Sequence, residues 1–399
     1  MAEPFDWGLL EPAGAVGVPA GDDRVLAAMI AVEEALAGAW DELDGSAARP
    51  GYEPLAFDAR TIDRARLVAG AREAGVPIIA LVEQLREQAG AHAGRVHRGA
   101  TSQDIVDSAL VLVSRESLSR ARDALAAAAA ELADRAIRSR ATPLLARTLT
   151  QQAEPTTLGA FLASWLDAVV SALEVLDRLD CPVQLGGAVG TGAAFARLAA
   201  RADAPQTLRA GVAARLGLSD PGRAWHTDRG PVLAIADAAA RVAAVAGRIG
   251  RDLGLAARDG VLLPATGGGS SAMPHKQNPV DAVLLTANGL RAPGLLATVH
   301  TAALSSDARP AGSGTPNGRP GARCCASRSR APRCWPTRSP TSWWRTARVA
   351  LRAPPSLRHL PSSRPLPSGE ATPPTWARRA PSWTPPSPAT VSMPITTER

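Results

Sequence analysis

The sequence predicts an all-α protein, built as a bundle of long helices. Apolar residues make up 46% of its 399 residues but aromatic residues only 4%, so alanine and leucine must supply most of the core. In several long windows the apolar residues recur every three or four positions, as on one face of an α-helix, and few windows alternate apolar and polar residues as a half-buried strand would. The helical windows are residues 24–37, 121–136, 156–179 and 232–257, with a further one from residue 280.

Four polar runs interrupt these windows. The first, residues 96–104, reads Val-His-Arg-Gly-Ala-Thr-Ser-Gln-Asp. Its glycine permits a turn, and Thr101 or Ser102 can cap the helix that follows, because a hydroxyl there accepts a free N–H of the first turn. The second run, residues 147–157, also precedes a long helix, and the third, residues 184–191, is rich in small residues that allow close backbone approach. Each run alone is more typical of helix capping than of a functional site.

The fourth run, residues 267–279, is the densest in reactive side chains: three glycines are followed by Ser270, Ser271, Lys276 and Asn278. Lys276 is the only lysine among 44 Lys and Arg. In a chain that otherwise uses arginine, one compact and flexible ammonium group indicates a specific role. Asn278 is a strong N-cap and the proline after it suits the first helical position, which predicts Lys276 and Asn278 at a helix N-terminus, where anions bind. The run therefore predicts a mobile loop with an activatable hydroxyl and a receptor for a carboxylate.

The fourth run resembles, nearly letter for letter, the G-S-x-x-M-P-x-K-x-N signature of the fumarase / aspartase / adenylosuccinate lyase superfamily. The other three runs resemble characteristic regions of that superfamily in the same chain order, and the resemblance extends over about residues 5–310. It implies an L-aspartase/fumarase-like long-helix bundle, with an N-terminal helical domain at residues 1–110 and a central bundle at residues 111–310 that carries the signature loop. It also implies a homotetramer in which each active site is assembled from several subunits.

Within the superfamily, the second run discriminates between branches. Adenylosuccinate lyases, argininosuccinate lyases and fumarases place a histidine directly after the threonine that matches Thr148, but here that position is Leu149, which cannot transfer a proton. The run resembles instead the bacterial 3-carboxy-cis,cis-muconate cycloisomerase family, as do residues 97–104, 184–191 and 225–229. That resemblance implies closure of a lactone by addition of a substrate carboxylate across a conjugated double bond. Two other interpretations stay open: an adenylosuccinate-lyase-like β-elimination enzyme, and an inactive or non-catalytic helical protein.

The resemblance to this family also implies roles for single residues. Ser270 is the acid/base that delivers a proton to carbon, with Ser271 as its close competitor, and Lys276 and Asn278 hold the carboxylate on which negative charge develops. Further donors bind the remaining carboxylate oxygens, and neutral amides replace the missing histidine. The expected donors are Thr101, Ser102, Gln103, Gln151 and Gln152.

Two charged groups have two interpretations each. His97 is the best remaining titratable group, either as a catalytic residue or as a buried, hydrogen-bonded histidine. Arg24, ahead of an amphipathic helix, is either a substrate-binding contact or a solvated charge at a helix start. His226 and His275 are expected to cap, pack or lie at the periphery. Because no cluster of His, Cys, Asp or Glu has metal-ligand spacing and no phosphate-binding glycine motif leads from strand to helix, we expect neither a metal nor a cofactor.

The last part of the chain follows a different pattern. Residues 311–399 lack helical periodicity and carry 14 arginines but only two acids, so that the net charge of +7 leaves −5 for residues 1–310. Half of the 34 prolines fall in this segment, together with tryptophan and cysteine, which disordered tails usually lack. Such a composition is typical of alanine-, leucine- and glutamate-rich codons read out of frame. Residues 311–399 are therefore predicted to be out of frame and disordered, and a genuine Pro/Arg-rich tail is the alternative.

Several classes of partner are not expected. A nucleic-acid-binding protein would need a basic face on a folded module, but residues 1–310 are mildly acidic. The N-terminus lacks the basic and apolar regions of a secretory signal, and no run of about 18 uncharged apolar residues predicts a membrane span. The four cysteines show neither zinc spacing nor a disulfide framework. We expect a cytoplasmic enzyme that acts on a small-molecule polycarboxylate.

Overall fold

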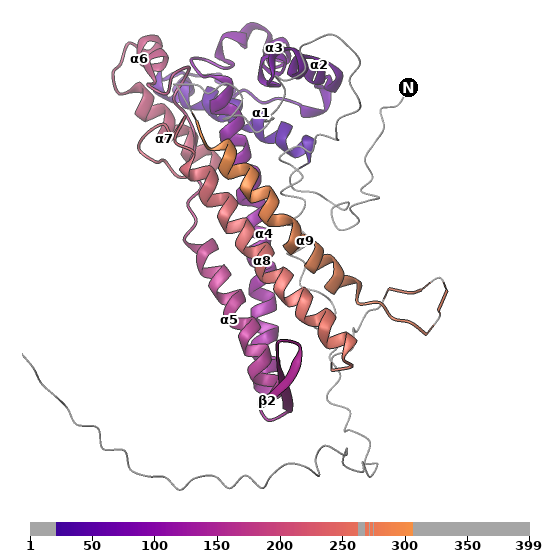
Figure 1. Ribbon diagram of the computed structural model, residues 1–399. Helices are drawn as coiled ribbons and strands as arrows, with labels where there is room; N and C mark the ends of the chain where they lie inside the picture. The colour runs from indigo at the N-terminus through magenta and orange to yellow at the C-terminus, as the bar shows by residue number, and fades with distance from the viewer. Residues whose placement is uncertain (1–20, 262–267, 271, 274, 306–399) are drawn as a thin grey trace, which may run out of the picture. The chain divides into compact units, whose positions relative to one another are not determined.

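Long helices dominate the computed structural model, which describes residues 21–261, 268–270, 272–273 and 275–305 (Figure 1). α4 packs against α5, α5 packs against α8, and α8 packs against α9. The predicted helical windows lie in these helices and in α1, except that the window at residues 156–179 exceeds α5 by two residues at each end. The all-α prediction is confirmed. The predicted tail at residues 311–399 and the competitor Ser271 lie outside the described residues. The bounds are α1 (Asp22–Leu43), α4 (Ser102–Arg138), α5 (Leu158–Asp177), α8 (Gly230–Arg258) and α9 (Val280–Ala302).

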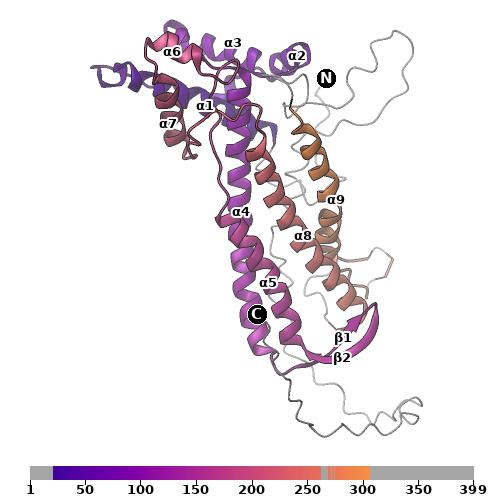
Figure 2. The same cartoon turned by 60° about the vertical axis from the view of Figure 1, so that its left-hand side comes forward.

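Shorter helices surround the beginning of α4 (Figure 2). They are α2 (Arg64–Ala74), α3 (Ile78–Ala89), α6 (Ala193–Ala199) and α7 (Ala204–Leu216), with 3-10 turns at Ser46–Ala48, Ala59–Thr61 and Gly90–Arg95. α1 contacts both α4 and α7. Aromatic residues are scarce, but Trp40 of α1 and Phe195 of α6 are fully buried, with ring centroids 6.3 Å apart. A few large rings thus join elements that are distant in sequence.

A two-stranded hairpin joins α4 to α5 and was not predicted. β1 (Pro143–Thr148) and β2 (Gln151–Thr157) pair antiparallel, with Thr148 opposite Gln151. The two turn residues have left-handed backbones, with φ of 48° at Leu149 and 69° at Thr150, as a type I′ turn requires. The second polar run therefore forms the turn and the second strand of this hairpin. It also caps α5 as expected, since the Thr157 hydroxyl accepts the N–H of Ala160 at 3.1 Å.

α8 and α9 approach each other closely enough for their backbones to touch. A Cβ atom built on Gly247 would lie only 2.7 Å from the Cα of Gly289. Next to this contact, a small buried cluster fills the interface with Ala243, Ala246, Leu285 and Ala292. Since the lysine loop connects these two helices, their contact fixes the two stems of the loop.

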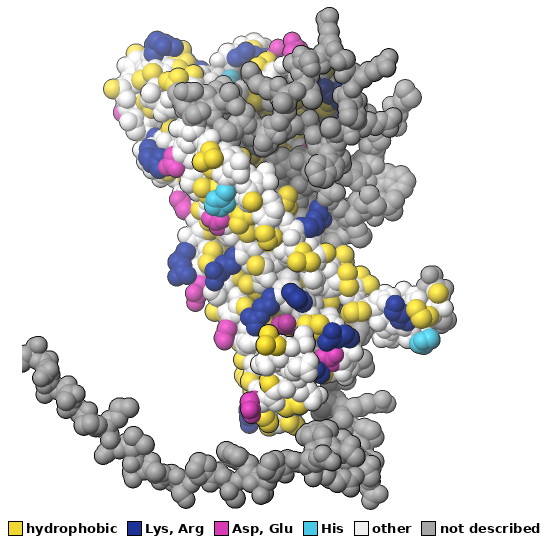
Figure 3. Space-filling view, in the orientation of Figure 1, with side chains coloured by type: hydrophobic (Ala, Val, Ile, Leu, Met, Phe, Trp, Pro, Cys, Tyr) yellow, Lys and Arg dark blue, Asp and Glu magenta, His cyan; other side chains and the backbone are white. Residues whose placement is uncertain are grey.

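Much of the apolar surface of the long helices is uncovered. By length and composition alone, α5 and α9 are apolar enough to cross a membrane. In the structure both pack against other helices. Even so, only 28% of the most apolar 18-residue window of α5 and 22% of that of α9 are buried. On α9, Val283 is 60% exposed and Leu290 75% exposed. Hydrophobic side chains accordingly lie on the surface over α8 and α9, among charged ones (Figure 3). The predicted domain boundary at residue 110 falls inside α4, and that division stays a prediction.

Candidate active site

The first and third polar runs lie together at the N-terminus of α4. Of the two predicted caps, Thr101 and Ser102, Thr101 is the N-cap. It forms a capping box with Asp104, whose carboxylate accepts the N–H of Thr101 at 3.0 Å. The third run reaches the same place, because a Cβ on Gly187 would lie 3.3 Å from the carbonyl oxygen of Gly99. Gly187 has a φ of 71°, a conformation that other residues adopt at a cost. The small residues of the third run therefore serve close approach, as expected.

Asp104 joins the two runs through four hydrogen bonds. Its Oδ1 accepts the N–H of Gly186 at 2.8 Å and the Nε2 of Gln184 at 3.1 Å. Its Oδ2 accepts the N–H of Gly187 at 2.9 Å, in addition to that of Thr101. Burial raises the pKa of the Asp104 carboxyl to about 6, although these donors act in the opposite direction. The donors stabilise the charge and so allow a buried carboxylate to hold both loops in place.

Gln184 extends this network to the segment before α8. Its Oε1 accepts the N–H of Trp225 at 2.9 Å, and its Nε2 lies 3.3 Å from Nδ1 of His226. The Gln103 amide is buried and donates to the carbonyl oxygen of His226 at 2.6 Å. His226 therefore packs inside, as expected. Gln103, predicted to bind substrate, here holds the neighbouring segment with its amide nitrogen.

A buried ion pair holds α8 against α4 just below this network. Arg229 donates from both terminal nitrogens to Asp107, at 2.7 and 2.9 Å. Both side chains are almost fully buried, and the guanidinium lies 5.2 Å from the centroid of the Trp225 ring. Such a fork between two planar groups fixes orientation as well as distance. Arg229 ends the motif at residues 225–229 that was noted in the sequence, but no role was predicted for it, and Asp107 was not singled out.

His97 is held by a carboxylate on α1. Its backbone N–H donates to Oε2 of Glu33 at 3.0 Å, and its Nδ1 lies 2.6 Å from Oε1 of the same residue. The Glu33 side chain is fully buried, whereas 16% of the His97 side chain is exposed. His97 lies in the same loop as Thr101. His97 is therefore a hydrogen-bonded and mostly buried histidine, as one interpretation expected. Its side chain also keeps some exposed surface, so a catalytic role stays a prediction.

Arg24 lies away from this group. It pairs with Glu116 of α4, a carboxylate that also accepts from Arg120 at 2.6 Å. Glu116 follows Thr101 by four turns of helix, or about 22 Å at 1.5 Å per residue. In this chain Arg24 therefore joins two helices and is remote from the donors of the first run, and its substrate-binding role stays a prediction.

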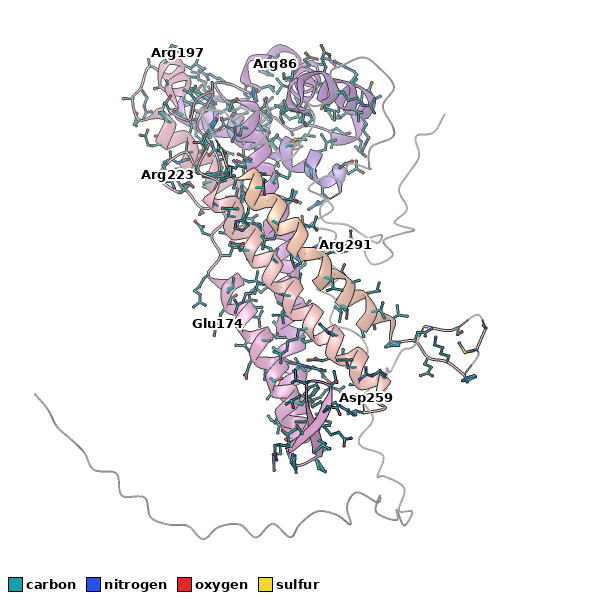
Figure 4. The ribbon with its side chains drawn as sticks, viewed as in Figure 1. Arg86, Glu174, Arg197, Arg223, Asp259 and Arg291 are labelled. Atoms are coloured by element: carbon teal, nitrogen blue, oxygen red, sulfur yellow. The ribbon has the colours of Figure 1, made fainter. Side chains whose placement is uncertain are left out.

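The second run lies at the other end of the long helices. Gln151 and Gln152 are exposed on β2, and Leu149 at the turn is 96% exposed. The hairpin is fastened to the end of α8, because Arg147 Nε lies 3.2 Å from a carboxylate oxygen of Asp259. Figure 4 labels Asp259 at this end of α8 and Arg223 near its beginning.

The lysine loop begins at the same end of α8. Ser270 Oγ accepts the backbone N–H groups of Met273 at 3.1 Å and Ala272 at 3.4 Å. Asn278 and Gly268 exchange two backbone hydrogen bonds, of 2.9 and 3.0 Å. Lys276 is exposed.

The prediction that Asn278 caps α9 is wrong. The helix begins at Val280 with Pro279 at the cap position, and no side chain caps it. Asn278 is drawn instead into the bridge with Gly268, and its Nδ2 donates to the carbonyl oxygen of Gly269 at 3.4 Å. Lys276 lies three residues before the cap position, and its backbone N–H donates to the carbonyl oxygen of Met273 within the loop at 3.0 Å.

The predicted site residues thus form two groups in one chain. The first contains His97, Thr101, Ser102 and Gln103 at the start of α4. The second comprises the residues at the other end of the long helices, Gln151 and Gln152 on the hairpin and Ser270, Lys276 and Asn278 in the lysine loop after α8. The 37 residues of α4 separate the first group from the hairpin, a length of about 55 Å at 1.5 Å per residue. A small carboxylate cannot span that distance, so the described part of one chain does not bring both groups to one substrate. Within the described ranges, no three His, Cys, Asp or Glu side chains gather as a metal site.

Known proteins resemble this chain over most of its described residues. A family model described as "Lyase" matches residues 21–294. The chain is 38% identical to the 3-carboxy-cis,cis-muconate cycloisomerase of Pseudomonas aeruginosa over 260 residues, which are 63% of this chain and 54% of that enzyme. It is 36% identical to the nitrosuccinate lyase of Streptomyces davaonensis over 336 residues, which are 78% of this chain and 69% of that lyase. The chain thus spans about half of the first relative and about two thirds of the second.

Solved structures show the same fold. The 3-carboxy-cis,cis-muconate lactonizing enzyme from Pseudomonas putida superposes with a TM-score of 0.65 at 28% identity, over 85% of this chain and 71% of that one. The fumarate lyase from Mesorhizobium sp. BNC1 superposes with a TM-score of 0.64 at 23% identity, which bears on the fold alone. The helices, the signature loop and these matches agree: the chain belongs to the lyase family of the fumarate lyase superfamily.

Proposed function

We propose that the chain converts 3-carboxy-cis,cis-muconate to 4-carboxymuconolactone, a lactonisation in the degradation of protocatechuate. The observation that carries this proposal is the hairpin turn. Where adenylosuccinate lyases, argininosuccinate lyases and fumarases have a histidine, this chain has Leu149, an exposed turn residue, and the neutral amides of Gln151 and Gln152 follow on β2. Leucine cannot transfer a proton, whereas amides can still hold a carboxylate. Relatives named 3-carboxy-cis,cis-muconate cycloisomerases support the same choice.

In the proposed reaction, an oxygen of one substrate carboxylate forms a bond to one end of a conjugated double bond. The π electrons move to the carbon next to another carboxylate, whose oxygens take up the negative charge, and that carbon then receives a proton. Ser270 supplies the proton from its hydroxyl. The backbone N–H groups of Ala272 and Met273, which donate to Ser270 Oγ, stabilise the oxygen after the proton has left. Lys276 and Asn278 hold the carboxylate that becomes charged.

The first group binds the remaining carboxylates in this proposal. Thr101 and Ser102 supply hydroxyls at the start of α4, Gln103 positions the adjacent segment, and His97 supplies a titratable ring. The separation of the two groups along α4 favours assembly of each site from several copies, and we infer a homotetramer. We place the enzyme in the cytoplasm, without a cofactor.

A second candidate is the cleavage of a substituted succinate. The match to nitrosuccinate lyase covers more of this chain, 78%, than the match to the Pseudomonas aeruginosa cycloisomerase does. Elimination from nitrosuccinate also develops negative charge beside a carboxylate, so the lysine loop would serve it equally. Adenylosuccinate cleavage is disfavoured because Leu149 replaces its histidine.

The experiment is a comparison of substrates with the full chain. We expect consumption of 3-carboxy-cis,cis-muconate and none of adenylosuccinate, and faster turnover of nitrosuccinate would favour the second candidate. Lys276→Arg should lower kcat/KM by about 10² to 10³, because one charge contact at the developing carboxylate is worth about 3–4 kcal/mol. His275→Gln, a change in the neighbouring exposed residue, is the matched control and should retain activity. Wild-type rates in Lys276→Arg would remove Lys276 from the mechanism.

A further inference from the structure

The clamp on His97 is unusual because both oxygens of Glu33 serve a single residue. Oε2 accepts the backbone N–H of His97 at 3.0 Å and Oε1 lies 2.6 Å from its Nδ1. Glu33 projects from α1 and is separated from His97 by 64 residues of sequence. Its side chain has no exposed surface. A buried carboxylate needs strong partners, so this contact is specific to His97 and not a solvated surface pair.

The backbone of His97 needs this support. Its φ is 59°, in the left-handed region that residues with a side chain seldom occupy. On the other side of the residue, the Arg98 guanidinium lies 3.8 Å from the centroid of the Trp40 ring, and the Trp40 indole N–H donates to the Arg98 carbonyl at 2.9 Å. α1 therefore fixes the loop on both sides of the imidazole.

The clamp also determines where the imidazole carries its hydrogen. An ionised carboxylate only accepts hydrogen bonds, so an ionised Glu33 selects the tautomer in which Nδ1 of His97 is the donor. In the neutral ring Nε2 is then an acceptor, and in the charged ring it is a second donor. Because 16% of the His97 side chain is exposed, a ligand can still contact it.

We propose that Glu33 is the positioning residue of His97: it fixes the Nδ1–H tautomer and leaves Nε2 as the atom that faces the substrate chemistry. Only the role of Nε2 toward a substrate rests on the proposed function. The tautomer itself is a property of the protein without substrate.

The test begins with the full chain labelled with ¹⁵N-histidine. Long-range ¹H–¹⁵N spectra report which ring nitrogen carries the hydrogen, and His97→Gln identifies the signals of His97. We expect the Nδ1–H tautomer in the neutral ring. Glu33→Gln should invert it, because the amide can present its NH₂ group to Nδ1 and move the hydrogen to Nε2. Asp41→Asn is the matched control on the same helix: Asp41 is also buried, but it pairs with Arg95 and Tyr52 and should leave the His97 signals unchanged.

An Nε2–H tautomer in the wild type would overturn the proposal without any variant, so a failure of Glu33→Gln to fold does not leave it undecided. An unchanged tautomer in a folded Glu33→Gln protein would also overturn it. Activity is the second measurement: Glu33→Gln should lower kcat about 10- to 100-fold with little change in KM, which is less than the roughly 10²- to 10⁴-fold of a whole general acid/base contribution because the imidazole is still present. The double variant with His97→Gln should be no slower than His97→Gln alone, because both changes act through one ring. If the chain turns over none of the substrates, the proposed function fails, but the tautomer still decides the role of Glu33.

Discussion

Replacing Gly247 with alanine should force α8 and α9 apart. The added Cβ would lie 2.7 Å from the Cα of Gly289, where ordinary contact begins at 3.4 Å. The obstructing atom is backbone, so no side chain can rotate away and the helices must separate by several tenths of an ångström. Their shared cluster of small side chains would then lose contact along the interface.

The magnitude follows from two opposing effects. Overpacking of a filled interface costs typically 1–3 kcal/mol. Alanine in a helix interior is favoured over glycine by about 1 kcal/mol, which partly offsets that cost. Gly254 provides the matched control, because it lies in the same helix and a Cβ there meets nothing within 4 Å. The helix-propensity gain cancels between the two variants, so Gly247→Ala should be less stable than Gly254→Ala by about 1–3 kcal/mol.

Urea denaturation of the full chain, followed by far-ultraviolet circular dichroism, measures this difference. Gly289→Ala should behave as Gly247→Ala does, since its Cβ would lie 2.7 Å from the Cα of Gly247. Equal stability of Gly247→Ala and Gly254→Ala would refute the close approach of the two helices.

Three further predictions concern Asp104, the ion pair between Arg229 and Asp107, and the turn of the hairpin. Burial raises the pKa of Asp104 from 3.8 to about 6, so its charge disfavours folding by roughly 3 kcal/mol at neutral pH. This penalty is complete above pH 6 and is relieved as the pH falls toward 3.8. The wild type should therefore gain stability relative to Asp104→Asn on acidification. If the urea midpoints of the two proteins changed in parallel from pH 8 to pH 4, the raised pKa of Asp104 would be contradicted. Arg229→Met leaves the buried Asp107 carboxylate unpaired and should cost about 3–5 kcal/mol in the free energy of unfolding, whereas a loss below about 1 kcal/mol would show that the pair does not hold α8 to α4. Leu149→Asn should stabilise the hairpin by about 1 kcal/mol, since asparagine tolerates the left-handed backbone, and thermal unfolding at or below the wild-type temperature would argue against this turn.

The sequence predicted the long helices well because their apolar period is long and uninterrupted. It also predicted Thr101 as a cap, since a hydroxyl before an apolar-periodic stretch has few other local uses. The contact between the first and third polar runs could not be predicted from the sequence. Asp104 and Gly186 are 82 residues apart, and no local pattern shows which distant N–H group a carboxylate will accept.

The missed features have physical reasons. The hairpin turns on Leu149 and Thr150 and lacks the asparagine or glycine that marks a two-residue turn in a sequence. Asn278 was predicted as a cap from its residue type, but its backbone is engaged by Gly268. Glu33 looked like any acid of an amphipathic helix, and only the fold shows that it is buried against His97.

The first turns of α4 depend on residues that are made much later. Asp104 reaches Gly186 across 82 residues, and Asp107 reaches Arg229 across 122. At about 5–20 residues per second, a ribosome adds those 82 residues in roughly 4 to 16 s. During that interval Asp104 has only its local partner, the N–H of Thr101, and Asp107 waits still longer for Arg229. The N-terminal end of α4 therefore cannot complete its packing before the segment ahead of α8 has emerged. The start of this long helix is therefore translated early but completes its packing only after Arg229, more than a hundred residues later, has been made.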